Sequence, residues 1–172
     1  CRKTLRIFVI PAKAGIHGSP GRAVARWIPA FAGMTQQNKR QNMNITHEHQ
    51  QLFDTTKDFV ENEINPNIEA WEKDGNWPAH DILKKMGDLG LLGICKPDEV
   101  GGLGLDYSYQ MQFAEALGYC HSGGIPMAIG VQTDMATPAL ARFGSDYLKE
   151  NFLKPAVAGD QVAAIAVSEP GA

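Results

Sequence analysis

The sequence lacks the cysteine pattern, the long apolar run and the basic body that mark three common classes of protein. Its three cysteines, Cys1, Cys95 and Cys120, are an odd number without C-x-x-C spacing, which argues against a disulfide framework or a zinc site and fits a reducing compartment. No apolar stretch approaches the roughly 20 residues that a membrane-spanning helix needs. We therefore expect a cytoplasmic protein with no membrane span.

Acidic residues are absent from residues 1–42, which contain eight Lys or Arg. Residues 43–172 hold the other eight basic residues against all nineteen acidic ones, hence a net charge of −11. Nucleic-acid affinity comes largely from Lys and Arg that neutralise phosphates. The acidic body is therefore not expected to bind nucleic acid.

Residues 1–42 are interrupted every few positions by proline or glycine, which prevents a continuous helix, so we expect a disordered leader. An organelle transit peptide is an alternative, but such peptides are rich in serine and this segment has only Ser19. The phrases VIPAKAGI and RWIPAFAGMT resemble a repeat found between bacterial genes. This favours spurious upstream translation of a bacterial reading frame, with the true start at Met43 and Met34 as second choice.

From residue 43 the pattern is that of amphipathic helices. Thr46 is expected to cap the first helix, which Pro66 breaks or kinks and Gly75 ends. A second helix follows Pro78 and ends at Gly90. The stripes expected to face the core are Leu52, Phe53, Phe59, Val60 and Ile64 in the first helix and Ile82, Leu83, Met86 and Leu89 in the second.

The rest of the chain predicts a turn-rich connector, more helices and a final strand. The connector, 91–105, leads to a third helix that Asp106 caps. Further helices are expected over 125–135, poor in charge and hence buried on most sides, over 137–142, and over 146–153, closed by Pro155. Residues 161–167 are short, apolar and partly β-branched, which is typical of a strand. In the third helix, the face expected to be buried comprises Tyr107, Met111, Ala114 and Leu117.

Several residues suggest chemistry, but each has a simpler structural interpretation. His47 and His49 lie two apart, so on a helix they point to different sides and cannot chelate one metal; we expect both at the surface. Cys120 and His121 are adjacent, which is poor geometry for a thiol and its base. The glycines of 101–104 lack the third glycine of a dinucleotide fingerprint and predict a turn. The acidic residues that could act as bases, but are expected on a solvated face, are Asp98, Glu99, Glu115 and Asp134.

Three stretches of residues 43–172 resemble the acyl-CoA dehydrogenase family. GDLGLLGICKPDEVGGLGLD is similar to the family's loop of GLLG followed by Pro-Glu-Glu-x-Gly-Gly-x-Gly, with Asp98 in the first acid position. FGSDYLKENFL resembles the helix that leads toward the family's first strand. AAIAVSEPGA resembles the signature in which an apolar strand runs into Thr/Ser-Glu-Pro-Gly-Ala-Gly-Ser-Asp. The three occur in the family's order and at its spacing.

The resemblance implies an all-α fold: the up-and-down helical amino-terminal domain of the family at 43–160, followed at 161–172 by the first strand of the middle β domain. It also implies FAD, which accepts a hydride as an acyl-CoA becomes a 2-enoyl-CoA, and an electron-transfer flavoprotein that reoxidises the flavin. The family is homo-oligomeric, a tetramer or a dimer. Its catalytic base is a glutamate of a carboxy-terminal domain, which these residues do not include. We therefore expect a fragment that is inactive alone.

By the same resemblance, Val167 and Ser168 occupy flavin-contacting positions, with the Ser168 hydroxyl suited to an edge atom of the isoalloxazine. Met127 and Val131 lie on the helix that corresponds to the wall of the acyl pocket, where flexible or small apolar groups suit a long or branched acyl chain. Ile165 stands where many members have Tyr, so that aromatic contact is not assumed. Two alternatives stay open: a non-catalytic helical interaction module, and a fragment of an acyl-CoA oxidase.

Overall fold

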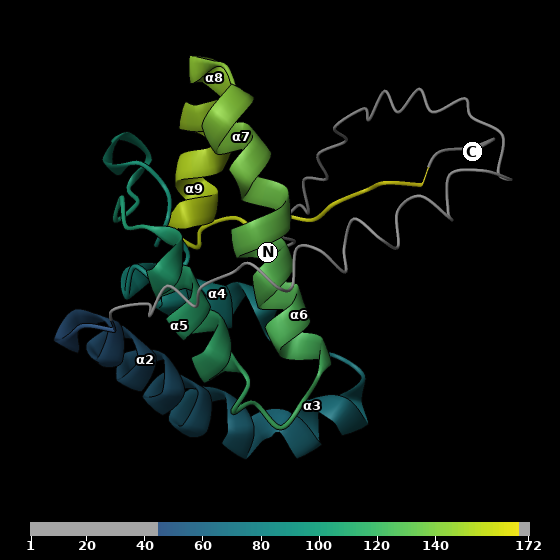
Figure 1. Cartoon of the computed structure of the whole chain (residues 1–172). Coiled ribbons are helices and arrows are strands. Elements are labelled where there is room, and N and C mark those ends of the chain that lie inside the picture. Colours follow the sequence, from purple (N-terminus) through teal and green to yellow (C-terminus); the bar gives the residue numbers. More distant parts are fainter. Residues whose placement is uncertain (1–44, 169–172) are drawn as a thin grey trace, which may run out of the picture. The chain divides into compact units, whose positions relative to one another are not determined.

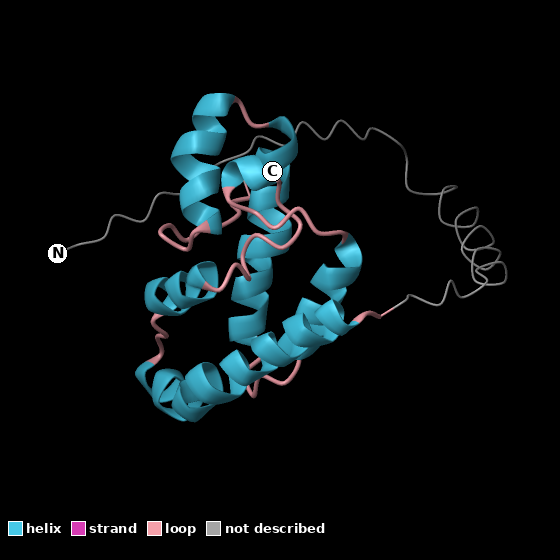
Figure 2. Cartoon of the chain, turned by 90° about the vertical axis from the view of Figure 1, so that its left-hand side faces the viewer, coloured by secondary structure: helices cyan, strands magenta, loops and turns pink. Residues whose placement is uncertain are grey.

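The structure is a computed structural model that describes residues 45–168, and the expected leader at 1–42 lies outside the described residues. The described part is helical and contains no strand, which confirms the all-α fold class (Figures 1 and 2). Most of the helices join end to end into three longer rods. The first rod comprises α2 (His47–Phe59), the π-helical turn η1 (Val60–Ile64), the 3-10 turn η2 (Asn65–Asn67) and α3 (Ile68–Asp74).

The second rod comprises α6 (Gly124–Gly130), the π-helical turn η4 (Val131–Ala136) and α7 (Thr137–Phe143). The third comprises α8 (Asp146–Leu148), the π-helical turn η5 (Lys149–Leu153) and α9 (Lys154–Val157). Along the chain, the first two rods are separated by α4 (Ala79–Asp88), a 3-10 turn η3 (Asp98–Val100) and α5 (Tyr107–Leu117).

The predicted helix ends are confirmed where a cap fixes them. Thr46 is the N-cap of α2, and Asp106 caps α5 by accepting from the Ser108 backbone N–H at 2.8 Å. Gly75 ends α3 with a φ of 64°, and Gly90 follows α4 with a φ of 76°, both in the left-handed region that favours glycine. Pro66 lies in η2, where the first rod changes from π to 3-10 geometry.

The core lies between α2, α4, α5 and α6, and it includes the connector before α5. Figure 1 shows α2 and α5 side by side, and these two helices pack along their length. The largest almost fully buried side chains of this core are Phe113, Ile64, Leu83, Met86, Leu91, Leu92, Ile94 and Ile129. The stripe predicted for α4 is confirmed at Ile82, Leu83 and Met86, but Leu89 is 51% exposed because α4 ends before it.

The buried face of α5 differs from the prediction. Tyr107, Met111 and Ala114 are exposed, and only Leu117 of the predicted face is buried. The residues that face inward are Gln110, Gln112, Phe113, Ala116 and Leu117. The prediction was wrong because the helix has two stripes with apolar members, and the buried one contains glutamines that the hydropathy pattern assigns to solvent.

His49 was expected at the surface but is 4% exposed. Its ring stacks on Tyr109 of α5 with 3.7 Å between centroids. The Thr46 backbone N–H donates to Nδ1 at 3.2 Å, so the proton of a neutral ring lies on Nε2, which then donates to the Ser108 hydroxyl at 2.7 Å. A histidine near the start of the first helix thus ties α2 to α5.

Three further predictions along the chain need correction. The helix that begins near 125 does not stop at 135 but continues through η4 into α7. It was expected to be buried on most sides, but the side chains of Met127 and Met135 are 64% and 53% exposed. The last helix is not closed by Pro155: it passes this residue, which lies at the start of α9 directly after the π-helical turn η5, and ends at Val157. Residues 161–167 form a loop, because a strand needs a paired neighbour and the described residues supply none.

The end of α9 packs closely against α4. Gly159 has a φ of 74°, and a Cβ added to it would lie 2.2 Å from the Leu83 carbonyl oxygen. A Cβ on Gly87 of α4 would lie 2.3 Å from the Ala158 carbonyl oxygen. This contact fixes where the chain leaves the helices and begins the segment over 160–168.

Candidate functional site

The second rod presents an open apolar face. Met127 on α6 is 64% exposed and Val131 is half-buried; they lie four residues apart and therefore on one side of the rod. The opposite side is core, with Ile125 at 5% and Ile129 at 0% exposure. The two residues predicted to line an acyl pocket thus share a surface that the described helices leave uncovered.

The segment over 160–168 begins against this rod. Val162 packs on the core, and the backbone at Gln161 and Ala163 is hydrogen-bonded to Gln132 of η4. Farther along, Val167 is 75% exposed and Ser168 is also exposed. Figure 1 shows this yellow stretch leaving the helical body. The structure therefore joins the start of the predicted flavin-contacting segment to Gln132, the residue after Val131, while Val167 and Ser168 are exposed at its far end.

The exposed end of this segment carries polar groups that no described residue engages. Within residues 45–168, neither the Ser168 hydroxyl nor the backbone of Val167 and Ser168 has a hydrogen-bond partner. A backbone N–H and a hydroxyl in this state can bond the polar edge of an isoalloxazine. These two residues could hold one edge of the cofactor, and the rest of its contacts would come from elsewhere.

A polar network that the sequence did not reveal lies behind the open face. Asp134 accepts at Oδ2 from the Gln110 side chain at 3.0 Å and from the Thr133 hydroxyl at 2.8 Å. Lys96 of the connector is only 6% exposed and donates from Nζ to the Thr133 backbone carbonyl at 2.8 Å. Asp134 is exposed, as predicted, and its hydrogen bond to Gln110 also links α5 to η4.

Burial lowers the pKa of Lys96, because the charged ammonium has lost water. The Asp134 carboxylate and the neighbouring Cys95 oppose this effect, and Arg142 adds to it. Burial likewise raises the pKa of the Cys95 thiol, which favours the neutral form and argues against a nucleophilic role. Keeping the Lys96 ammonium charged therefore costs the folded domain free energy.

We expect the unfolding free energy of the wild-type chain to rise relative to that of Lys96→Met as the solution becomes alkaline. A lowered folded-state pKa penalises the fold fully below that pKa, and the penalty disappears as pH rises toward the ordinary value of 10.5. Urea unfolding at a series of pH values measures the difference, with exposed Lys73→Met as control. In the variant the Thr133 carbonyl keeps the Thr137 hydroxyl as a donor, at 3.1 Å. Parallel pH profiles of wild type and Lys96→Met would contradict the prediction.

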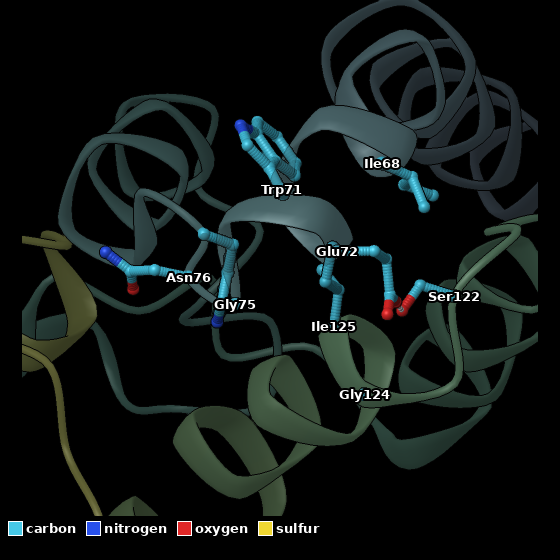
Figure 3. A pocket seen from close by; sticks show the side chains of 9 residues that line it. Ile68, Trp71, Glu72, Gly75, Asn76, Ser122, Gly124 and Ile125 are labelled. Atoms are coloured by element: carbon cyan, nitrogen blue, oxygen red, sulfur yellow. Dashed lines mark hydrogen bonds between the residues drawn. The ribbon is translucent and has the colours of Figure 1, made fainter.

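A separate cavity of about 300 Å³ lies between α3 and α6 (Figure 3). At one side the Ser122 hydroxyl donates to Glu72 Oε1 at 3.0 Å, and in Figure 3 these two side chains point toward each other. Its apolar lining is Ile68, Trp71, Trp77 and Ile125. None of Met127, Val131, Val167 and Ser168 lines it, so the cavity is distinct from the predicted site.

The part of the chain that the structure describes lacks two other kinds of feature. No group of three or more His, Cys, Asp or Glu residues is arranged there to hold a metal ion. No helix over 45–168 is long and apolar enough to cross a membrane.

The helical domain is similar to one family of known proteins. Residues 46–160 match the family model for the acyl-CoA dehydrogenase N-terminal domain. The chain is 36% identical over 132 residues to the mitochondrial short-chain specific acyl-CoA dehydrogenase of Homo sapiens. The aligned residues are 76% of this chain and 31% of that protein. The chain thus spans about a third of the length of the curated relatives it matches.

Solved structures that resemble this chain include acyl-CoA dehydrogenases. A probable acyl-CoA dehydrogenase from Mycobacterium abscessus is 37% identical with a TM-score of 0.66, over 74% of this chain and 34% of that one. An acyl-CoA dehydrogenase from Bacillus anthracis, complexed with FAD, is 32% identical with a TM-score of 0.68, over 75% of this chain and 22% of that one. The predicted site residues are not tested by these similarities and stay predictions.

Proposed function

Since this chain belongs to the acyl-CoA dehydrogenase family, of which it contains the amino-terminal helical domain, we propose that it forms one wall of an FAD-dependent site that converts an acyl-CoA to a 2-enoyl-CoA. The observation that carries the proposal is the open apolar face of the second rod. Met127 is 64% exposed and shares one side of the rod with half-buried Val131, while the other side is core, and this arrangement supports contact with an apolar ligand.

The residues on this wall have separate roles. Met127 and Val131 contact the acyl chain and exclude water from it. The Ser168 hydroxyl and the Val167 backbone hold an edge of the flavin. FAD, when bound, supplies the hydride acceptor. Removal of the α-proton needs a positioned carboxylate, and by the family resemblance that glutamate belongs to a further domain.

The partners follow from the same assignment. They are an acyl-CoA thioester, an electron-transfer flavoprotein and further copies of the protein in a tetramer or dimer, acting in fatty acid β-oxidation in a bacterial cytoplasm.

The length of the acyl chain can be tested separately. The human relative is specific for short chains, whereas Met127 and Val131 favour a long or branched chain. A C4, C8 and C16 substrate series on the complete enzyme distinguishes these outcomes.

The 172 residues alone are expected neither to retain FAD through a desalting column nor to oxidise acyl-CoA with an artificial electron acceptor. Weak, saturable contact is nevertheless expected: in an NMR titration with FAD, the amides of Val167 and Ser168 should shift. Ser168→Ala should weaken these shifts, and Ser168→Thr, which keeps the hydroxyl, should restore them.

Two outcomes would overturn this assignment. Turnover by the 172 residues would mean that they contain the base. Absence of any saturable shift at Val167 and Ser168 would remove the flavin contact and favour the non-catalytic helical interaction module. An acyl-CoA oxidase shares the same signature, and it would be recognised by reaction of the reduced complete enzyme with oxygen.

A further inference from the structure

One side chain connects the helical domain to the segment that follows it. Gln132 lies in the π-helical turn η4 of the second rod, one residue after Val131, and is 1% exposed. A buried amide has two N–H donors and one oxygen acceptor, and each group left unpaired would cost free energy. The partners that satisfy Gln132 therefore reveal what the residue does.

All three of its bonds go to backbone at the exit from the last helix. Nε2 donates to the Ala156 carbonyl at 2.9 Å and to the Gln161 carbonyl at 3.0 Å. Oε1 accepts from the Ala163 N–H at 2.6 Å. One side chain thus bonds the end of α9 and both sides of Val162, which packs on the core.

The π-helical turn makes this arrangement possible. A π turn holds an extra residue compared with an α-helical turn, and in η4 the adjacent residues Gln132 and Thr133 are both buried, at 1% and 2% exposure. Thr133 serves the network with Asp134, which leaves Gln132 to face the exiting chain. A shorter or apolar side chain at 132 would leave the backbone groups of Gln161 and Ala163 without these partners.

We propose that Gln132 is a positioning residue that fixes the path of 161–168 and thereby places Val167 and Ser168 for the flavin. The flavin part of this inference rests on the proposed function, whereas the anchoring part does not. Gln132 acts through the segment and itself touches no cofactor.

The test is residue-resolved amide hydrogen exchange of the 172-residue chain without flavin. In Gln132→Met, which keeps the volume and removes all three bonds, the Ala163 amide should exchange about tenfold faster, while the amides of α4 and α5 keep their protection. Gln132→Glu keeps an acceptor for Ala163 and, at a pH low enough to protonate its carboxyl, also one donor for the Ala156 or Gln161 carbonyl, so under those conditions it should restore part of the protection at Ala163. The control is Gln112→Met. Gln112 is also buried, but among the described residues its side chain bonds only Glu115 of its own helix, at 3.4 Å, so this change should leave Ala163 unchanged.

The two parts of the inference fail separately. Unchanged exchange at Ala163 in Gln132→Met, or equal loss of protection throughout the domain in both the Met and Glu variants, would overturn the anchor. If the anchor holds, Gln132→Met should also need several-fold more FAD to shift Ser168 in the NMR titration. Failure of FAD to shift the wild-type chain would instead count against the proposed function, and the exchange result would still decide the role of Gln132.

Discussion

Gly159→Ala is expected to lower the free energy of unfolding by about 3 kcal/mol or more. Gly159 has a φ of 74°, where an L side chain is strained, and the new Cβ would lie 2.2 Å from the Leu83 carbonyl oxygen. That oxygen belongs to the backbone of α4, so it cannot move without displacing the helix. Denaturant unfolding measures the loss, and the exit of the chain toward 161–168 should shift with it.

Gly75→Ala is the matched control for this prediction. Gly75 has a similar φ of 64°, but a Cβ there would meet nothing within 4 Å. It therefore reports backbone strain alone, which is expected to cost about 1–2 kcal/mol. If Gly159→Ala costs no more than Gly75→Ala, the close approach of α4 and the end of α9 is wrong.

Phe113→Ala is expected to cost about 3–5 kcal/mol, since the ring has no exposed surface and its removal leaves a cavity in the core. Met111→Ala on the same helix is the control; Met111 is 47% exposed, and the change should stay within about 0.5 kcal/mol. The pair also tests which face of α5 is buried. A larger loss for Met111→Ala would restore the face that the sequence predicted.

The sequence predicted best the features that depend on neighbouring residues alone. Thr46, Asp106, Gly75 and Gly90 act over one helical turn, so each could be assigned without knowing the tertiary structure. The stripe of α4 was also predicted correctly, because its buried positions Ile82, Leu83 and Met86 are uniformly apolar. Local chemistry and helical spacing suffice for such elements.

The errors arose where burial depends on a partner from another element. Gln110 is buried because Asp134 accepts a hydrogen bond from it. His49 is buried because it bonds the Ser108 hydroxyl and stacks on Tyr109. Hydropathy assigns both residues to solvent. The candidate site shows the same limit. Met127 and Val131 were predicted by resemblance to a family, while Gln132 was missed. Its signal was present in the sequence as a glutamine and a threonine within a helix otherwise poor in polar residues.

The π-helical turn η4 has a consequence for changes in chain length. Buried residues of the second rod recur at every fourth position, at Ile125, Ile129, Thr133 and Thr137. In a regular α-helix each step of four residues would rotate this row by about 40°, and the wider turn takes up that drift and keeps the row straight. Because a π turn holds one residue more than an α-helical turn, loss of one residue within η4 would convert it to regular α-helix and leave Thr137 and the rest of α7 close to their present facing. The same loss within α6 would instead rotate every later position by about 100°.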